Sequence, residues 1–126
     1  MPIRIHINEE RGVFVIEIAG KIVSGAMEAF LHELLADPAF RSGMNGLFDM
    51  RRFTSSELGP EEVRRCAEIA SENEARFAGS RWAIVAPEHS VAFGMARMYE
   101  LVRDAKSYEM HTFSDIEAAR AWVGLD

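Results

Sequence analysis

The sequence predicts an α/β fold: a single domain with a mixed sheet of five strands and four helices in the order β-β-α-β-α-β-α-β-α. The chain has 126 residues, of which 48% are hydrophobic, enough for one packed core. Short alternating runs at the start are followed by segments whose apolar residues recur at helical spacing. No repeat, low-complexity tract or Pro/Gly/Ser-rich linker divides the chain, so residues 1–126 are predicted to form one domain.

A hairpin is predicted at the start. Ile3, Ile5 and Ile7 alternate with polar residues, which is the period of a strand with one buried face. A short polar connection ends at Gly12, and the apolar run 13–18 is the expected antiparallel partner.

The next segment predicts an amphipathic helix that ends near Asp37 and Pro38. Its apolar residues fall at i, i+3, i+4, i+7 and i+8, and they are Met27, Phe30, Leu31, Leu34 and Leu35. The strand after this helix is expected to run parallel to the second strand, through a right-handed crossover.

The nearly all-apolar runs 46–50 and 81–86 predict central strands that are covered on both faces. Pro60 stands at the first position of a helix between them, and Glu61 and Glu62 follow in its positively polarised first turn. The inward stripe of this second helix is predicted to contain Val63, Cys66, Ala67, Ala70 and Phe77.

The rest of the chain predicts a third helix over residues 89–103, an edge strand over residues 108–113 and a fourth helix. The fourth helix opens on Ser114 with Glu117 three residues later, which is the pattern of a capping box. Phe93 projects to nearly the opposite side of the third helix from the residues predicted to face inward. Those inward residues are Val91, Met95, Met98, Tyr99 and Val102.

Composition excludes several classes of protein. The 14 Lys and Arg residues against 20 Asp and Glu give a net charge of −6, which argues against nucleic-acid binding because that function needs a basic surface. No uncharged stretch approaches the roughly 18 residues of a membrane span, so at most peripheral membrane contact is expected. Residues 1–5 alternate like a strand rather than a signal peptide, and a single cysteine cannot form an internal disulfide. We therefore expect a cytoplasmic protein.

The motifs of familiar enzymes are missing from the sequence. It has no Gly-rich phosphate loop, nucleophile elbow, His-Glu-x-x-His or Cys-x-x-Cys pattern. The four histidines lie on four different predicted elements, and Cys66 lies on an inward stripe, where a packed thiol is expected. We predict no catalytic residues, no metal, no cofactor and no enzyme activity.

One segment, residues 48–59, gathers an acid, two guanidinium groups and three hydroxyls between a buried strand and a helix. Two interpretations are open. Ordinary turn and cap chemistry explains such residues. Alternatively, the segment is a recognition loop with a phosphorylatable serine, because a phosphate near a helix N-terminus meets free N–H groups. The candidate loop residues are Asp49, Arg51, Arg52, Ser55 and Ser56.

The chain resembles the STAS fold and, within it, the SpoIIAA-like proteins, which are also called STAS/SEC14-like. The resemblance spans the whole chain and rests on the order of elements, on Asp49 at the end of the run 46–50, and on the segments 53–59 and 113–123.

This resemblance implies a non-enzymatic domain, and some SpoIIAA-like proteins are thought to hold an apolar, lipid-like ligand or to touch membranes. Anti-sigma-factor antagonists of this fold carry an Asp-Ser-Ser-Gly motif with a phosphorylatable serine. In this sequence Thr54 stands in place of the Asp and Glu57 in place of the Gly.

The third helix is apolar beyond one face, which is typical of a helix buried by a partner or covering an adaptable cavity, although one exposed Phe is also ordinary. We predict a binding module in which this helix and the helix from Pro60 flank a pocket for a small apolar or lipid-like ligand. Phe93 is the predicted interface to a protein partner or to a second copy in a homodimer. A phospho-regulated protein-interaction switch is the alternative. The predicted lining residues are Val63, Ala67, Ala70, Met95, Met98 and Tyr99.

Overall fold

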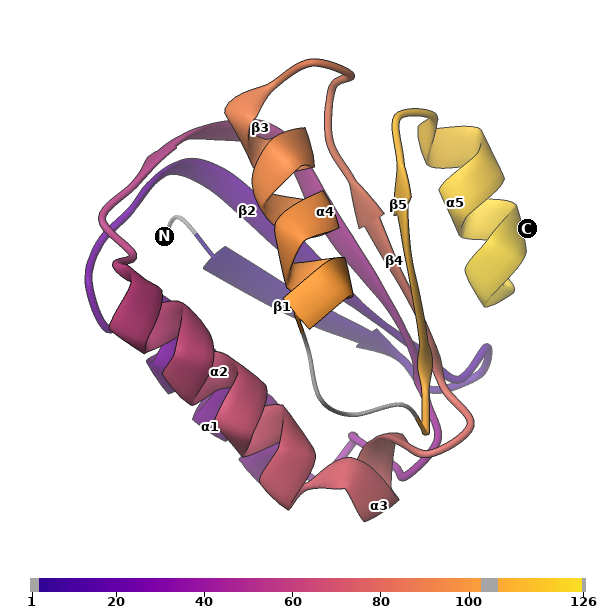
Figure 1. The fold of residues 1–126 in the computed structure, drawn as a ribbon. Helices are drawn as coiled ribbons and strands as arrows, with labels where there is room; N and C mark the ends of the chain where they lie inside the picture. Colours follow the sequence, from indigo (N-terminus) through magenta and orange to yellow (C-terminus); the bar gives the residue numbers. More distant parts are fainter. Residues whose placement is uncertain (1–2, 103–106, 126) are drawn as a thin grey trace.

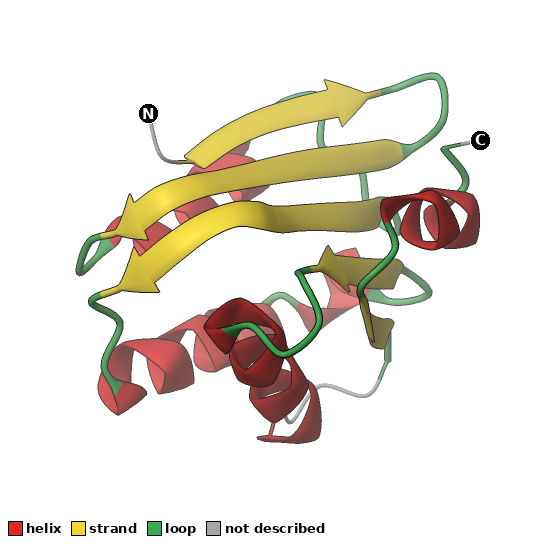
Figure 2. Ribbon diagram, turned by 90° about the horizontal axis from the view of Figure 1, so that it is seen from above, coloured by secondary structure: helices red, strands yellow, loops and turns green. Residues whose placement is uncertain are grey.

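The computed structural model describes residues 3–102 and 107–125, and it has one mixed sheet with helices on both faces (Figures 1 and 2). The predicted α/β class and five-stranded sheet are confirmed. The strands are β1 (Ile3–Asn8), β2 (Val13–Ile22), β3 (Asn45–Ser56), β4 (Arg81–Val85) and β5 (Glu109–Phe113). The helices are α1 (Ala26–Ala36), α2 (Pro60–Glu72), α3 (Glu74–Phe77), α4 (Val91–Val102) and α5 (Ile116–Val123).

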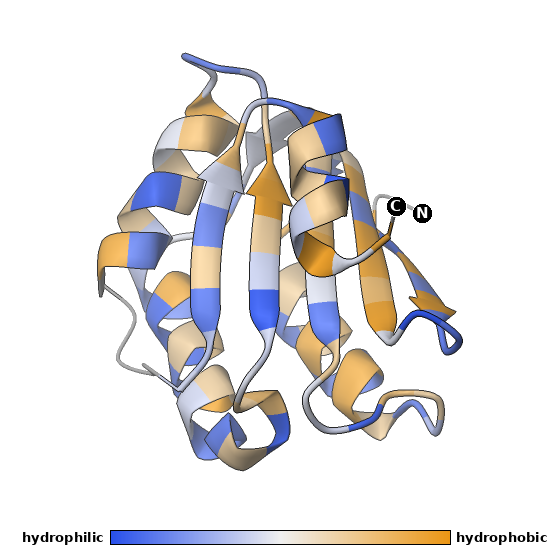
Figure 3. Cartoon of the chain, turned by 90° about the vertical axis from the view of Figure 1, so that its right-hand side faces the viewer, coloured by the Kyte–Doolittle hydropathy of each residue, from blue (hydrophilic) through white to orange (hydrophobic). Residues whose placement is uncertain are grey.

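The order of strands across the sheet is β1-β2-β3-β4-β5, the same as their order along the chain. β1 and β2 form the predicted antiparallel hairpin, and β2 to β5 run parallel to one another. Gly12 closes the hairpin with φ 68°, a left-handed conformation that glycine adopts without strain. Hydropathy along β5 alternates, as expected of an edge strand, whereas β4 is hydrophobic after Arg81 (Figure 3).

Two separate cores lie on the two faces of the sheet. When successive parallel strands are added at the same edge of a sheet and every crossover is right-handed, the crossover helices all lie on the same face of the sheet. Phe14, Phe48 and Trp82 accordingly share the larger core with side chains of α1, α2 and α4. On the other face, α5 contributes Ala119 and Val123 to a smaller core.

β2 and β3 are longer than the sequence predicts. The apolar runs end at residues 18 and 50, but the strands remain paired to Ile22 and Ser56, with register shifts after Glu17 and after Gly20. The outer part of β3 is mostly exposed and polar. The outer part of β2 contains Gly20 and the register shifts and reaches a buried apolar residue only at Ile22, so neither part shows the regular alternation that predicts a strand. The segment from Asp49 to Ser56 is therefore strand, and the prediction of a loop there was wrong.

The second predicted helix is divided into α2 and α3, which gives five helices instead of four. The division falls at Asn73, whose side-chain amide donates to the carbonyl oxygen of Ile69 at 2.8 Å. The predicted end of α1 is confirmed by its C-cap at Asp37. The fourth predicted helix, α5, is capped by Asp115, which accepts from the backbone N–H of Glu117, rather than by Ser114.

The inward face of α4 differs from the prediction. Among the described side chains of this helix, Ala92 and Ala96 are the buried ones, whereas Val91 and Met98 are 71% and 66% exposed. Two small side chains let the helix lie close to the sheet, so the larger apolar side chains are displaced to its flanks and outer face. The side chain of Val102 and residue 103 lie outside the described part of the chain.

Candidate ligand site

An apolar cavity of about 180 Å³, partly open to solvent, lies on the helix-rich face of the sheet. α1, α2 and α4 wall it on one side, and β2 to β5 form its floor. The helices contribute Met27, Phe30, Leu31, Val63, Cys66, Met95, Ala96, Met98 and Tyr99. The strands and the connection before α2 contribute Ile18, Phe48, Met50, Leu58, Trp82, Ile84 and Met110.

Small side chains explain why this volume is left open. α2 and α4 turn Cys66 and Ala96 toward it, where two longer side chains would fill the space between the helices. Native cores leave few voids larger than a water molecule. The volume of about 180 Å³ is therefore larger than the voids of an ordinary core.

Methionine is concentrated in the cavity wall. Of the seven methionines in the chain, five line it: Met27, Met50, Met95, Met98 and Met110. Four aromatic residues join them, and they are Phe30, Phe48, Trp82 and Tyr99. Methionine side chains adapt to irregular shapes and make favourable contacts with aromatic rings. The cavity wall can therefore adapt to the shape of a ligand, and it presents polarizable sulfur atoms and rings to it.

Cys66 is a buried free thiol in this wall. Burial raises its pKa to about 11, and the nearby carboxylates of Glu62 and Glu28 act in the same direction. Arg65 acts in the opposite direction but is outweighed, so the thiol is protonated at neutral pH and is not activated as a nucleophilic cysteine is. The expectation of a packed Cys66 is confirmed by its burial.

The structure brings four of the six predicted lining residues to the cavity: Val63, Met95, Met98 and Tyr99. Ala67 and Ala70 do not line it. Ala70 is buried in the larger core and Ala67 is half-buried farther along α2. Phe93, the predicted interface residue, is half-buried on α4 outside the cavity wall. Sequence reasoning missed the contributions of α1 and the sheet, because most of the methionines that meet in the cavity wall are far apart along the chain.

The predicted loop residues are not gathered at one point. Asp49 and Ser55 lie six residues apart on β3, about 20 Å at the rise of an extended strand. Asp49 is in register with Glu17 of β2, and it lies away from the cavity. These residues therefore do not form one compact site.

Asp49 is paired with Arg51 in a bidentate contact. Arg51 Nε donates to Oδ1 at 2.9 Å, Arg51 Nη2 donates to Oδ2 at 2.8 Å, and the backbone N–H of Arg51 also donates to Oδ1. Partial burial opposes ionisation of Asp49, but the hydrogen bonds from Arg51 outweigh it and lower the pKa of this carboxyl. Arg52 lies beside the pair and is exposed. The contact with Arg51 therefore accounts for the presence of an acidic residue at position 49.

The two serines at the end of β3 differ. Ser55 is exposed, whereas Ser56 is half-buried and its Oγ accepts from the backbone N–H of Leu58 at 2.9 Å. Glu57 then binds Lys21 Nζ at 2.9 Å and accepts from the N–H of Ser24. These contacts, first of all the one from Lys21, lower the pKa of Glu57. These contacts of Glu57 hold the connection between β3 and α2 against the end of β2.

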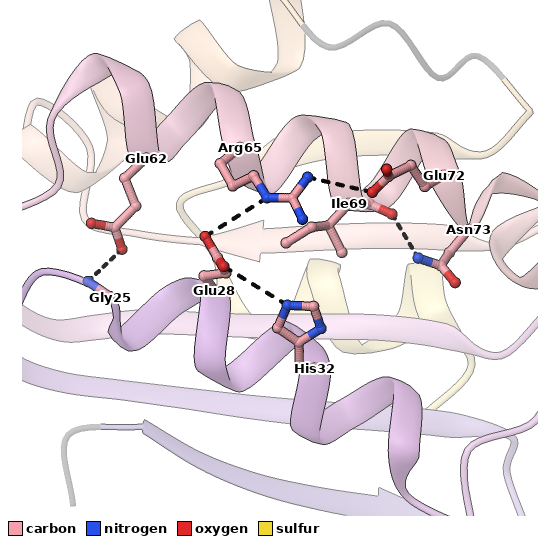
Figure 4. A network of polar contacts seen from close by, with 8 residues as sticks. All are labelled: Gly25, Glu28, His32, Glu62, Arg65, Ile69, Glu72 and Asn73. Atoms are coloured by element: carbon pink, nitrogen blue, oxygen red, sulfur yellow. Dashed lines mark hydrogen bonds and ion pairs between the residues drawn. The ribbon is translucent and has the colours of Figure 1, made fainter.

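A polar network joins α1 to α2 at the side of the cavity (Figure 4). Gly25 at the start of α1 has φ 85° and no side chain to cap the helix, and a carboxylate oxygen of Glu62 accepts from its N–H at 2.8 Å. Arg65 lies between Glu28 and Glu72, with N–O distances of 3.9 and 3.5 Å. Glu62 therefore supplies from α2 the anionic cap that α1 lacks.

Among the described residues, no group of three His, Cys, Asp or Glu side chains is placed to hold a metal ion. Within the same part of the chain, each helix is too short or too polar to cross a bilayer.

Comparison with known proteins identifies the family. Residues 13–124 match the family model described as SpoIIAA-like. The structure is similar to that of an uncharacterized DUF3478-family protein with a SpoIIAA-like fold from Shewanella loihica PV-4, with a TM-score of 0.61 and 16% identity over 96% of this chain and 91% of that one. It is also similar to the anti-sigma factor antagonist SpoIIAA in its unphosphorylated form, with a TM-score of 0.56 and 12% identity over 97% and 98% of the two chains.

At these identities the two solved structures establish the fold alone. No curated protein sequence matches the chain. The family model covers nearly the whole of the chain, and the chain therefore belongs to the SpoIIAA-like family.

Proposed function

We propose that this domain is a non-enzymatic binding module that holds a small apolar or lipid-like ligand. The observation that carries the proposal is the cavity of about 180 Å³ under α2 and α4, whose lining residues are almost all apolar. An engineered cavity of about 150 Å³ with similar walls stays dry and binds benzene. An empty cavity costs stability, so a ligand that fills this one stabilises the folded chain.

The first test is native mass spectrometry of gently purified protein, followed by titration with fatty acids and apolar dyes. Two reporters are built into the chain. Trp82 lines the cavity, and Trp122→Phe removes the second tryptophan, which packs on the other face. Cys66 is the single cysteine, so its rate of labelling by a small apolar thiol reagent reports occupancy. We expect bound ligand to change Trp82 fluorescence and to slow labelling of Cys66.

A matched pair of variants shows whether binding uses the cavity. Ala96→Phe places a ring in the cavity wall, and Ala118→Phe adds the same ring at an exposed position of α5. We expect the first variant to lose binding and the second to retain it. The absence of a co-purified ligand, together with no binding of fatty acids or dyes to the folded wild type, would overturn the proposal.

Self-association is a second part of the proposal. Its support is the outer surface of α4, where Val91, Met98 and Leu101 are exposed, Leu101 by 75%. Phe93, the predicted interface residue, is half-buried and lies on nearly the opposite side of the helix from Val91 and Met98, so it does not belong to this surface. Light scattering after size-exclusion chromatography is expected to detect a dimer that Leu101→Glu dissociates. A wild type that is monomeric at all concentrations would exclude a homodimer.

A phospho-regulated interaction switch is the second candidate function. Its support is Ser55, which is exposed at the end of β3 shortly before α2. Phosphorylation in a cell extract is expected to be lost in Ser55→Ala and retained in Ser71→Ala, which changes an exposed serine of α2. If the wild type is never modified there, this candidate fails. Both candidates place the protein in the cytoplasm, where the thiol of Cys66 stays reduced.

A further inference from the structure

We propose that the cavity takes an uncharged aromatic ring in preference to an alkyl group of the same size. This inference rests on the proposed function, since it names the chemical class of the ligand that the same cavity holds.

Size sets the first limit. A cavity of about 180 Å³ is slightly larger than the engineered cavity of about 150 Å³ that binds benzene. A single substituted ring fills it, whereas a long acyl chain has to leave most of its length outside. The ligand, or the part of it that is enclosed, is therefore compact.

The wall then distinguishes between rings and alkyl groups. Thioether sulfurs make favourable contacts with aromatic rings at about 5 Å, and five methionines line this cavity. Aromatic pairs also gain energy from edge-to-face geometry, and four aromatic side chains contribute to the wall. A saturated ring of equal size buries the same apolar area but forms neither contact.

The surroundings of the cavity disfavour anions. Among the residues that the structure describes, none that lines the cavity is Lys, Arg or His. The raised pKa of Cys66, caused by burial and by the carboxylates of Glu62 and Glu28, indicates that negative charge is costly at this wall. A carboxylate would have to lie outside, at the open side of the cavity.

The experiment compares toluene, methylcyclohexane and benzoate on the full chain by isothermal titration calorimetry. Toluene and methylcyclohexane have the same number of carbon atoms and differ in aromaticity, and benzoate adds a negative charge to the ring. We expect toluene to bind about 2- to 10-fold more tightly than methylcyclohexane, and benzoate to bind at least tenfold more weakly than toluene.

Methionine variants test the reason for the preference. Met95→Leu and Met98→Leu remove a sulfur at nearly constant volume, and Met44→Leu is the matched control because Met44 is buried outside the cavity. We expect the ratio of toluene to methylcyclohexane affinity to fall in the two cavity variants and to stay constant in Met44→Leu. Thermal unfolding checks that each variant is folded. If one cavity variant does not fold, the other is sufficient for the test.

The outcomes separate the two proposals. Equal affinities for toluene and methylcyclohexane would overturn the aromatic preference, and a ratio unchanged in both cavity variants would overturn its assignment to the methionine sulfurs. Binding of long-chain fatty acids without binding of toluene would also overturn the aromatic preference, but would leave the proposed function intact. Failure of every apolar compound to bind would overturn both.

Discussion

The two faces of the sheet are covered to different extents, and the more extensively covered face contains a cavity. Helices α1, α2 and α4 cover one face and still leave a cavity of about 180 Å³ between them and the sheet. One helix, α5, covers part of the other face and packs there against small side chains such as Ala83. Beyond α5 the second face is polar, and its carboxylate Asp49 is already paired with Arg51. Extensive cover therefore does not imply dense packing, and the unfilled volume is the better guide to a binding site.

The largest expected effect compares two leucines. Leu47 is in the core under α5, and Leu31 is buried but lines the cavity. Leu47→Ala is expected to lower the free energy of unfolding by about 4 kcal/mol, and Leu31→Ala by about 2 kcal/mol, because a side chain beside a cavity has fewer contacts to lose. Urea denaturation measures both values. Equal losses would mean that the two faces are packed to the same density.

A smaller effect, of opposite sign on the two faces, is expected from adding volume. Ala83 is fully buried under α5, and Ala96 lines the cavity. Ala83→Met is expected to destabilise the domain by about 1–3 kcal/mol through overpacking. Ala96→Met adds the same atoms next to open volume and is expected to raise the melting temperature. Calorimetry of the two variants decides whether the cavity accepts a side chain without strain.

The smallest effect concerns Asp49 and pH. Its pKa is lowered in the folded chain, so its contribution to stability is present above the unfolded pKa of about 3.9 and is lost as the pH falls through the folded pKa. Asp49→Asn is expected to lower the free energy of unfolding by about 1 kcal/mol or less at pH 7, because Arg51 is about half exposed and solvent screens the pair. It is also expected to reduce the loss of stability below pH 4.

Denaturation of wild type and Asp49→Asn between pH 2 and 7 provides the measurement. Ligand affinity at pH 7 is expected to stay the same in this variant, because Asp49 does not line the cavity. A changed affinity would show that the polar part of the second face and the cavity act together.

The sequence was sufficient to predict the fold because its strongest patterns report burial directly. The alternation of Ile3, Ile5 and Ile7 located the first strand, and the helical stripe from Met27 to Leu35 located α1. The end of β3 could not be predicted because the strand extends to exposed, polar residues. The end of β2 could not be predicted because Gly20 and the register shifts interrupt its alternation before Ile22. In that region the pairing of backbone groups, rather than an apolar period, defines the strand.

The candidate site was only partly predictable because a cavity depends on volume between elements. Helical spacing assigned Val63, Met95 and Tyr99 to inward positions, and they line the cavity. The same reasoning ranked large apolar residues above small ones on α4, so it missed the burial of Ala92 and Ala96. The distance between a helix and a sheet is set by the smallest residues at the contact. A hydrophobic pattern gives little weight to such residues, because their side chains are only weakly apolar.

The agreement between strand order in the sheet and strand order in the chain has a consequence for how the domain is made. Synthesis delivers the N-terminal part first, so the β1–β2 hairpin can form before β3 is available. Each later strand then adds to the free edge next to its predecessor, and no strand has to enter between two that are already paired. The sheet can therefore grow in one direction as the chain is synthesised.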